Sequence, residues 1–190
     1  MKLLATLKEI QKEVEERYRC TGRTPIYHFR SEIHVRTSFP GQYKGQEANN
    51  RFIYEIVYSH VKPTDEQVEQ LMESQLWISK LLLALNKLIS EDVIRRIHQQ
   101  MPKHPLCTIP ETIEMAIAEN PQTPDDVLEA LAQGISYEVV SKISERDNLS
   151  ARIAGIVKER EKAKEQMRKE SRKEDFLACG ELEVVESGRY

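Results

Sequence analysis

The sequence is poor in the residue types that hold small secreted proteins together and that build glycine-rich nucleotide sites. Its 190 residues include three cysteines and seven glycines, and aromatic residues make up 6%. An odd number of scattered cysteines argues against a disulfide-bonded secreted scaffold, and so few glycines leave little material for loops that cradle phosphates. The chain also lacks a run of about 18 apolar residues, which excludes a membrane-spanning helix and a membrane partner.

Short catalytic motifs are missing as well. The chain has no Gly-x-Ser-x-Gly, Walker loop, Gly-x-Gly-x-x-Gly or His-Glu-x-x-His. We therefore expect a protein that is not an enzyme and has no cofactor, and we name no catalytic residue. The apolar start at residues 3–7 is too short for the core of a signal peptide, so we expect a cytoplasmic location.

Charge is abundant but unevenly distributed. Charged residues make up 31% of the chain, and the net charge is −3. Residues 1–62 carry a net charge of +4, residues 63–156 carry −7, and the remainder balances. The first third is thus the part that favours a polyanionic partner, although offsets of this size are also common in soluble domains without any such role.

The first hundred residues predict a helix followed by a β-hairpin. Apolar residues recur at steps of three and four over residues 2–19, as on one face of a helix. From Ile26 the period changes to two: Tyr27, Phe29, Ile33 and Val35 fall on one face, and His28, Arg30, Glu32, His34 and Arg36 on the other. This alternation is typical of a half-buried strand. Residues 51–61 fit either a second strand or a helical face, and their β-branched and aromatic content favours the strand.

A long buried helix is expected next. Thr64 and Gln67 have the spacing of a capping box, in which each side chain bonds the backbone at the other's position. The helix should run to about Ile89, because the apolar residues of its centre leave almost no polar face. A further helix is expected to about Gln100, and three prolines within residues 102–110 exclude a regular helix there.

A degenerate repeat occupies residues 113–157. At an offset of 26 residues, Ile117 aligns with Ile143, Val127 with Ile153, and Leu131 with Val157. A period in the twenties is typical of stacked repeat units. Well-capped helices in an ordinary bundle are the alternative.

The segment resembles the leucine-rich repeat variant family. The resemblance rests on residues 118–124, Ala-Glu-Asn-Pro-Gln-Thr-Pro, followed by Val127-Leu128 and Leu131-Ala132. It covers one good unit and one degraded unit, about a quarter of the chain. It implies a right-handed solenoid in which α-helices alternate with 3₁₀ helices.

The last part of the chain predicts one long helix from Ala151 to about Asp175. From Lys158 onward it has almost no apolar stripe and several oppositely charged pairs three residues apart, each worth a few tenths of a kcal/mol. A solvated helix and an arm that becomes ordered on a partner are the two interpretations.

Two groups of residues are candidate sites. The polar face of the first predicted strand, with its neighbours, is basic and suits phosphate contacts; its candidate nucleic-acid-binding residues are Arg23, His28, Arg30, His34, Arg36 and Lys44. Alternatively, these cations only discourage edge-to-edge aggregation of the strand. His98, His104 and Cys107 are candidate zinc ligands, but a structural zinc needs a fourth ligand that nothing nearby supplies, so we expect no metal site.

The sequence as a whole predicts a mainly helical α+β protein in three parts. These are an α+β domain at residues 1–101, a helical-repeat-like segment at 102–157, and a charged helix and tail at 158–190. Repeat stacks present extended surfaces to other proteins, so the first hypothesis is a non-enzymatic adaptor or subunit that binds another protein, or a second copy of itself. The alternative is a nucleic-acid-binding protein that uses the basic face of the hairpin. A zinc- or thiol-dependent enzyme is the third hypothesis.

Overall fold

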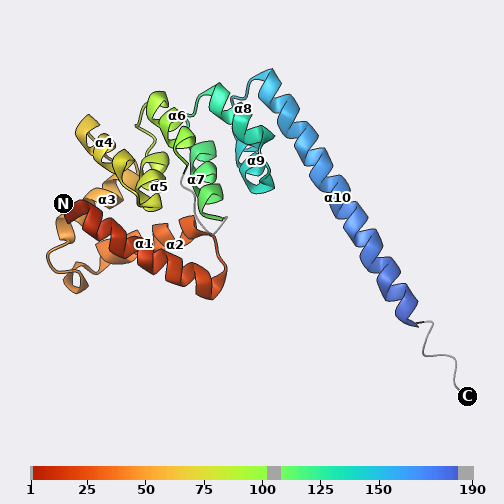
Figure 1. Ribbon diagram of the computed structural model, residues 1–190, viewed down its shortest axis with the longest axis horizontal. Coiled ribbons are helices and arrows are strands. Elements are labelled where there is room, and N and C mark those ends of the chain that lie inside the picture. Colours follow the sequence, from red (N-terminus) through yellow and green to blue (C-terminus); the bar gives the residue numbers. More distant parts are fainter. Residues whose placement is uncertain (1, 102–107, 184–190) are drawn as a thin grey trace, which may run out of the picture.

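A computed structural model describes residues 2–101 and 108–183 of the chain, with side chains up to residue 171. This part is helical throughout and contains no strand. Its elements, shown in Figure 1, are α1 Lys2–Thr21, α2 Pro25–Ser38, the 3₁₀ helix η1 Pro40–Gln42, α3 Glu47–Val57, α4 Asp65–Glu73, α5 Trp77–Leu85, α6 Glu91–Gln99, α7 Thr108–Glu119, α8 Asp125–Gln133, α9 Tyr137–Ser144 and α10 Ala151–Glu183. None of these helices is long and apolar enough to cross a membrane.

The predicted α+β class and its β-hairpin are wrong. Residues 25–38 form α2, which buries positions three and four residues apart. Three of those positions hold the polar residues His28, Glu32 and Arg36, which the alternating pattern assigned to a solvent-exposed strand face. The sequence pattern did not show the helical period, because a pattern of apolar residues leaves out positions at which a polar side chain is buried.

The second predicted strand is also wrong, and the helical alternative for residues 51–61 is correct as far as Val57. Helix α3 buries Asn50, Ile53, Ile56 and Val57, which share one helical face. The β-branched and aromatic content of this segment was therefore misleading, because strand propensity reflects packing environment more than an intrinsic backbone preference.

The predicted long helix at residues 64–89 is two helices. The capping box of Thr64 and Gln67 is confirmed at the start of α4, but this helix ends at Glu73. The Ser74 hydroxyl then accepts a hydrogen bond from the backbone amide of Leu76 at 3.1 Å. This bond closes the turn between α4 and α5. All nine residues of α5 are buried, so the shorter helix keeps the central position expected for the longer one.

Helices α3 to α9 form a stack. The helices α3, α5, α7 and α9 form one row in which each packs on the next, and α4, α6 and α8 lie on one side of this row (Figure 1). The hairpin of α1 and α2 packs against α3 and also contacts α5 and α7. Trp77 of α5 anchors it, because its indole nitrogen donates to Glu15 of α1 at 2.8 Å.

A ladder of side-chain hydrogen bonds connects successive members of the row. Asn86, after α5, donates to the backbone oxygens of Ile56 and Val61 at 2.9 and 2.8 Å. Asn120, after α7, donates to those of Ala84 and Asn86 at 2.8 and 2.9 Å. Arg146, after α9, donates to those of Ala118 and Asn120 at 3.0 and 2.7 Å. Each donor therefore bonds carbonyls at or after the C-terminal end of the preceding helix of the row, where helix carbonyls lack an intrahelical partner.

The 26-residue offset corresponds to equivalent places in this stack. Ile117 and Ile143 are both fully buried in α7 and α9, and Leu131 and Val157 are buried in α8 and α10. The units pair α-helix with α-helix, and within the described residues the only 3₁₀ helix is η1. The alternation of α and 3₁₀ helices implied by the family resemblance is thus absent.

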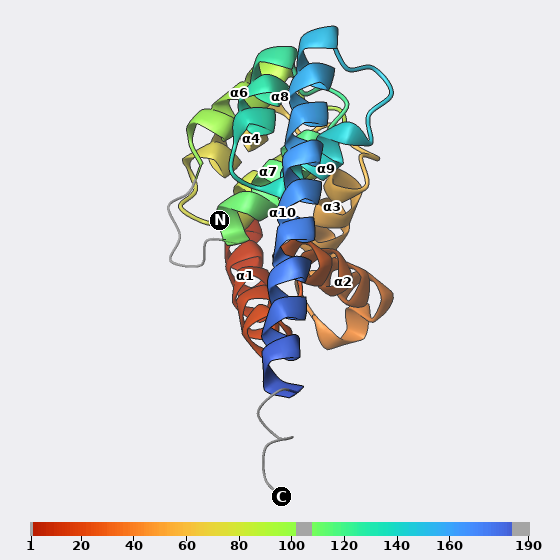
Figure 2. The same cartoon turned by 90° about the vertical axis from the view of Figure 1, so that its right-hand side faces the viewer.

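Helix α10 begins in the stack and then leaves it (Figures 1 and 2). Ile153 and Val157 are buried against the stack, whereas residues 158–171, here called the arm, are exposed except for the partly buried Arg160 and Lys164. At the 26-residue offset Arg160 takes the place of Gly134, which ends α8. Helix α10 has 33 residues, a length of about 50 Å.

Candidate functional site

The predicted basic face does not exist as a surface, because residues two apart on a helix point in nearly opposite directions. Of the six basic candidates, Arg23, Arg30, His34 and Lys44 are exposed, whereas His28 and Arg36 are buried in the helix hairpin. The structure therefore divides the predicted nucleic-acid-binding residues between solvent and core.

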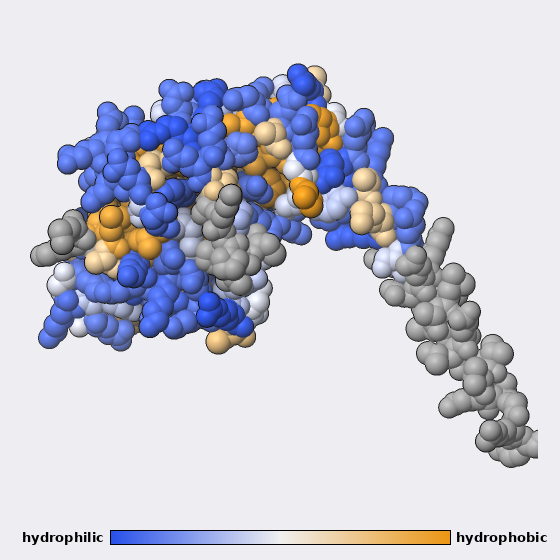
Figure 3. Space-filling view, in the orientation of Figure 1, coloured by the Kyte–Doolittle hydropathy of each residue, from blue (hydrophilic) through white to orange (hydrophobic). Residues whose placement is uncertain are grey.

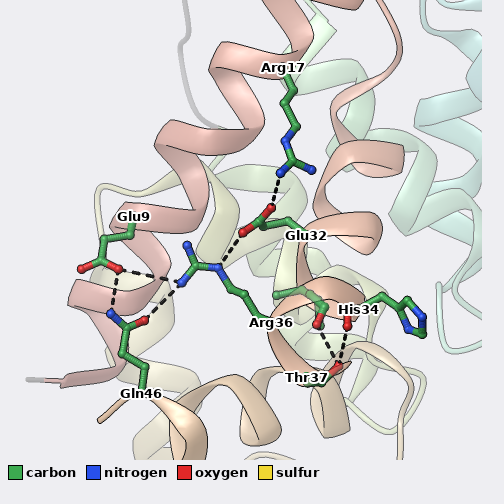
Figure 4. A network of polar contacts seen from close by, with 8 residues as sticks. Glu9, Arg17, Glu32, His34, Arg36, Thr37 and Gln46 are labelled. Atoms are coloured by element: carbon green, nitrogen blue, oxygen red, sulfur yellow. Dashed lines mark hydrogen bonds and ion pairs between the residues drawn. The ribbon is translucent and has the colours of Figure 1, made fainter. Parts of the chain in front are cut away.

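Arg36 belongs to a buried charge network (Figure 4). Its Nε atom lies 2.8 Å from Oε1 of Glu32, which is 1% exposed, and the other oxygen of Glu32 lies 2.8 Å from Nη2 of Arg17. The Nη1 atom of Arg36 donates to Gln46 at 3.1 Å, and Gln46 donates to Glu9 at 2.9 Å. The network links α1, α2 and the segment before α3, so its role is to join these elements.

His28 is held in a polar contact rather than presented to a ligand. Its Nε2 atom lies 2.8 Å from the hydroxyl of Thr21 at the turn between α1 and α2. Burial, with the nearby cations Arg17 and Arg23, lowers the pKa of His28 below its ordinary value of 6.5. A neutral imidazole does not contribute a phosphate-binding charge.

The exposed basic residues also have partners or lie apart. Arg30 pairs with Glu119 of α7 at 3.4 Å, and the guanidinium of Arg23 lies 5.5 Å from the ring centre of Tyr27. His34 lies on α2 and Lys44 in the segment after η1. The six candidates therefore do not form the basic strand face that was predicted, although Arg30 and His34, four residues apart on α2, are both exposed. The nucleic-acid hypothesis loses the face on which it depended.

Of the three candidate metal ligands, the structure describes His98 alone. No group of three or more His, Cys, Asp or Glu residues in the described part of the chain has a metal-binding arrangement. His98 is partly buried on α6; burial lowers its pKa, and Asp126 opposes this effect. His104 and Cys107 lie outside the described residues.

Sequence reasoning missed an exposed apolar residue at the end of the stack. Ile109, at the start of α7, is fully buried, whereas Ile135, 26 residues later, is 96% exposed. Ile135 precedes α9, and the residues of α9 that are more open than their α7 counterparts are polar: buried Thr112, Ala116 and Ala118 correspond to Glu138, Lys142 and Ser144. Terminal units of repeat proteins are usually polar on the outer side, so Ile135 is the exception.

Ile135 lies beside the point where the arm leaves the stack. Arg160 donates from Nη2 to the backbone oxygens of Gly134 and Ile135 at 2.6 and 3.1 Å. Its guanidinium also lies 4.7 Å from the ring centre of Tyr137, whose hydroxyl lies 3.4 Å from the sulfur of Met167. Tyr137 therefore contacts the arm at Arg160 and at Met167. We call the group Ile135, Tyr137, Arg160, Lys164 and Met167 the arm surface.

The offset of 26 residues was the signal that could have identified Ile135, since it aligns this residue with the start of α7. Its exposure depends on which segments pack beside it, which is a tertiary property.

No protein-family model, curated protein or solved structure matches the chain.

Proposed function

We propose that the protein is a non-enzymatic interaction module that binds another protein through the arm surface and the adjoining helix α10. The observation that carries this proposal is the arm itself, a helical extension whose residues 158–171 have few tertiary contacts. Figure 3 shows that the coloured part of α10 outside the stack is mostly hydrophilic, with a small apolar patch.

The physics of isolated helices supports a partner for such an arm. Most helical stability in proteins comes from packing of an apolar face, and a helix that is polar on all sides has no such face. The arm has intrahelical pairs such as Lys169 with Glu165 at 3.7 Å, but exposed pairs of this kind contribute only about 0.3–0.5 kcal/mol each. Contacts with a second protein would supply the missing stabilisation.

Ile135 is suited to be the apolar anchor of that contact. A side chain that is 96% exposed gains about 1.5–3 kcal/mol on full burial. Met167, 58% exposed, is the second apolar side chain of the arm surface, and its flexible thioether adapts to the shape of a partner. Arg160 and Lys164, on either side of Tyr137, supply the polar rim that surrounds such anchors in protein interfaces.

The test is a native affinity purification of the full chain with two matched variants, after nuclease treatment. We expect wild type to retain a protein that Ile135→Asp loses by at least about ten-fold, and that Leu88→Asp retains. Leu88 is the control because it is also an exposed apolar side chain, at 45%, but lies between α5 and α6. Equal recovery of the protein by both variants would overturn the proposal. So would the finding that nuclease treatment removes all of the protein that the untreated chain retains.

A further inference from the structure

Asn50 of α3 has a buried side-chain amide without a hydrogen-bond partner. The residue is 1% exposed, and neither its Nδ2 nor its Oδ1 atom meets a donor or an acceptor in the part of the chain that the structure describes. Asn86 and Asn120 are buried as well, but their amides bond backbone oxygens. Because an unpaired amide inside a protein costs free energy, the amide of Asn50 requires an explanation.

A cavity of about 430 Å³ adjoins Asn50, between the end of α2, the 3₁₀ helix η1 and α3. Asn50 and Arg36 are the buried residues of its lining, and the other lining residues are half-buried or exposed. The two buried residues therefore mark the inner end of the cavity. A ligand that fills the cavity reaches Asn50 there.

Most of the surface inside the cavity is apolar, and its lining includes two aromatic rings. The ring centres of Tyr54 and His60 are 5.9 Å apart, and the rings are nearly perpendicular, with an interplanar angle of 79°. A flat ligand can stack on one ring and place its edge against the other, and aromatic groups prefer these two arrangements. The cavity therefore suits a flat ring, and its volume lies in the range of small-molecule sites.

The charged groups of the lining are largely paired within the protein. Arg36 lies 2.8 Å from Glu32 (Figure 4), and Arg51 lies 3.0 Å from Glu55. Glu47, in the first turn of α3, is exposed and disfavours an anion. A charged ligand would compete with the existing pairs, whereas a neutral ligand leaves them in place. The lining thus favours a neutral ligand.

We propose that this cavity binds a small neutral aromatic amide. An asparagine amide has one carbonyl acceptor and one donor group, and the amide edge of the ligand presents the complementary pair. The amide of Asn50 turns toward the ligand, donates to its carbonyl oxygen and accepts from its N–H, in the two-bond manner in which asparagine pairs with adenine. The ring of the ligand packs against Tyr54 and His60. None of the lining residues belongs to the arm surface, so this site does not depend on the proposed function.

Three probes of similar size test the chemistry of the ligand. Nicotinamide carries a carboxamide on an aromatic ring, and uracil is a nucleobase with the amide edge inside its ring. The methyl ketone of the same pyridine ring has a methyl group in place of the amide nitrogen of nicotinamide. Binding is followed by the shifts of the backbone amide signals of α3 in proton–nitrogen correlation spectra of the full chain.

We expect saturable binding of nicotinamide, of uracil or of both in the millimolar range. The methyl ketone should bind about ten-fold more weakly than nicotinamide, because it has no N–H to donate to Asn50 and leaves that oxygen unpaired. The stronger of nicotinamide and uracil shows whether the natural ligand class is a carboxamide or a nucleobase.

Two neighbouring asparagines provide matched variants. Asn50 lines the cavity, whereas Asn49 does not line it and donates to Thr6 at 3.2 Å. We expect Asn50→Leu to weaken nicotinamide binding by at least about ten-fold and Asn49→Leu to leave it unchanged. Leucine is close to asparagine in shape and has no polar group to pair, so Asn50→Leu should also raise the midpoint of urea denaturation. Asn49→Leu should lower this midpoint, because it removes the bond to Thr6.

The aromatic lining gives a second pair of variants. Tyr54→Leu removes a ring from the cavity and should weaken nicotinamide binding by about ten-fold. Tyr27→Leu should leave binding unchanged, because Tyr27 is an exposed aromatic residue of α2 that does not line the cavity. This pair tests binding independently of any effect on the fold at Asn50.

Any of four results would overturn the proposal. The first is the absence of a saturable shift with both nicotinamide and uracil up to about 100 mM, and the second is equal affinity for nicotinamide and the methyl ketone. The third is equal nicotinamide affinity of the two variants in either pair. The fourth is a lower urea midpoint for Asn50→Leu than for Asn49→Leu, which would show that the amide of Asn50 serves the fold.

Discussion

Asn120 donates a hydrogen bond from its side-chain nitrogen to the backbone oxygen of Asn86, 2.9 Å away. Asn86 makes the same kind of bond to the segment before it, and Arg146 makes it to Asn120. Both asparagines are almost completely buried. The stacked helices are thus connected by buried polar contacts as well as by apolar packing.

Replacing Asn120 by alanine should lower the free energy of unfolding by about 2–4 kcal/mol. The side chain donates to two backbone oxygens and accepts from the amide of Gln122, and a buried group left without a partner costs about 1–3 kcal/mol. Urea denaturation followed by circular dichroism measures the change. Asn148→Ala, at an exposed site, should change the free energy of unfolding by less than about 0.5 kcal/mol. Equal effects of the two variants would show that the hydrogen-bond ladder does not stabilise the stack.

Glu32→Gln should destabilise the protein by about 3 kcal/mol. The substitution removes the nearer counterion of Arg36, whose side chain is 4% exposed, and leaves only Glu9 at 3.8 Å; breaking a buried pair costs about 3–5 kcal/mol. Arg17 is 40% exposed and can turn to water, so the lower value is expected. Glu55→Gln removes the partner of the exposed Arg51 and should cost less than about 1 kcal/mol. Similar urea midpoints for both variants would exclude a stabilising network.

Stability should fall as the pH decreases through the range in which histidines titrate. The folded state lowers the pKa of His28 by burial and by Arg17 and Arg23, so the unfolded chain binds the proton more tightly. Stability is therefore fully present above the ordinary pKa of 6.5 and is lost as the pH falls below it. Urea midpoints at about pH 7.5 and pH 5.5 measure this difference.

The histidine responsible is identified by substitution. His28→Gln should reduce the loss of stability between these two pH values, whereas His34→Gln, at an exposed position of the same helix, should leave it unchanged. His98, whose pKa burial also lowers, accounts for part of the remaining dependence. A pH dependence that is the same in both variants would argue against His28 as a contributor.

Tyr137→Ala should loosen the arm without unfolding the stack. Its ring lies beneath the guanidinium of Arg160, and its hydroxyl contacts Met167. Removing these contacts raises the rate of local opening, so trypsin should cut within residues 158–169 several-fold faster. Tyr58→Ala, at an aromatic residue that is 42% exposed, is the control; unchanged cleavage of the arm in Tyr137→Ala would show that Tyr137 does not hold it.

Local signals placed several helices correctly. The capping box of Thr64 and Gln67 depends on residues three apart. The 26-residue offset paired buried positions of α7 with those of α9. Such features are readable in the sequence because the groups that interact are neighbours, or because equivalent units repeat the same pattern.

Contacts between distant segments decided the rest. Helix α2 looks like a strand until His28, Glu32 and Arg36 are known to be buried, and Glu32 and Arg36 are buried with Arg17 and Gln46 as partners from other segments. Lys80 is buried because the end of α4 supplies two backbone oxygens for its ammonium group. Polar burial depends on which partners the fold brings within hydrogen-bonding distance, and a periodic pattern of apolar residues carries no record of those partners.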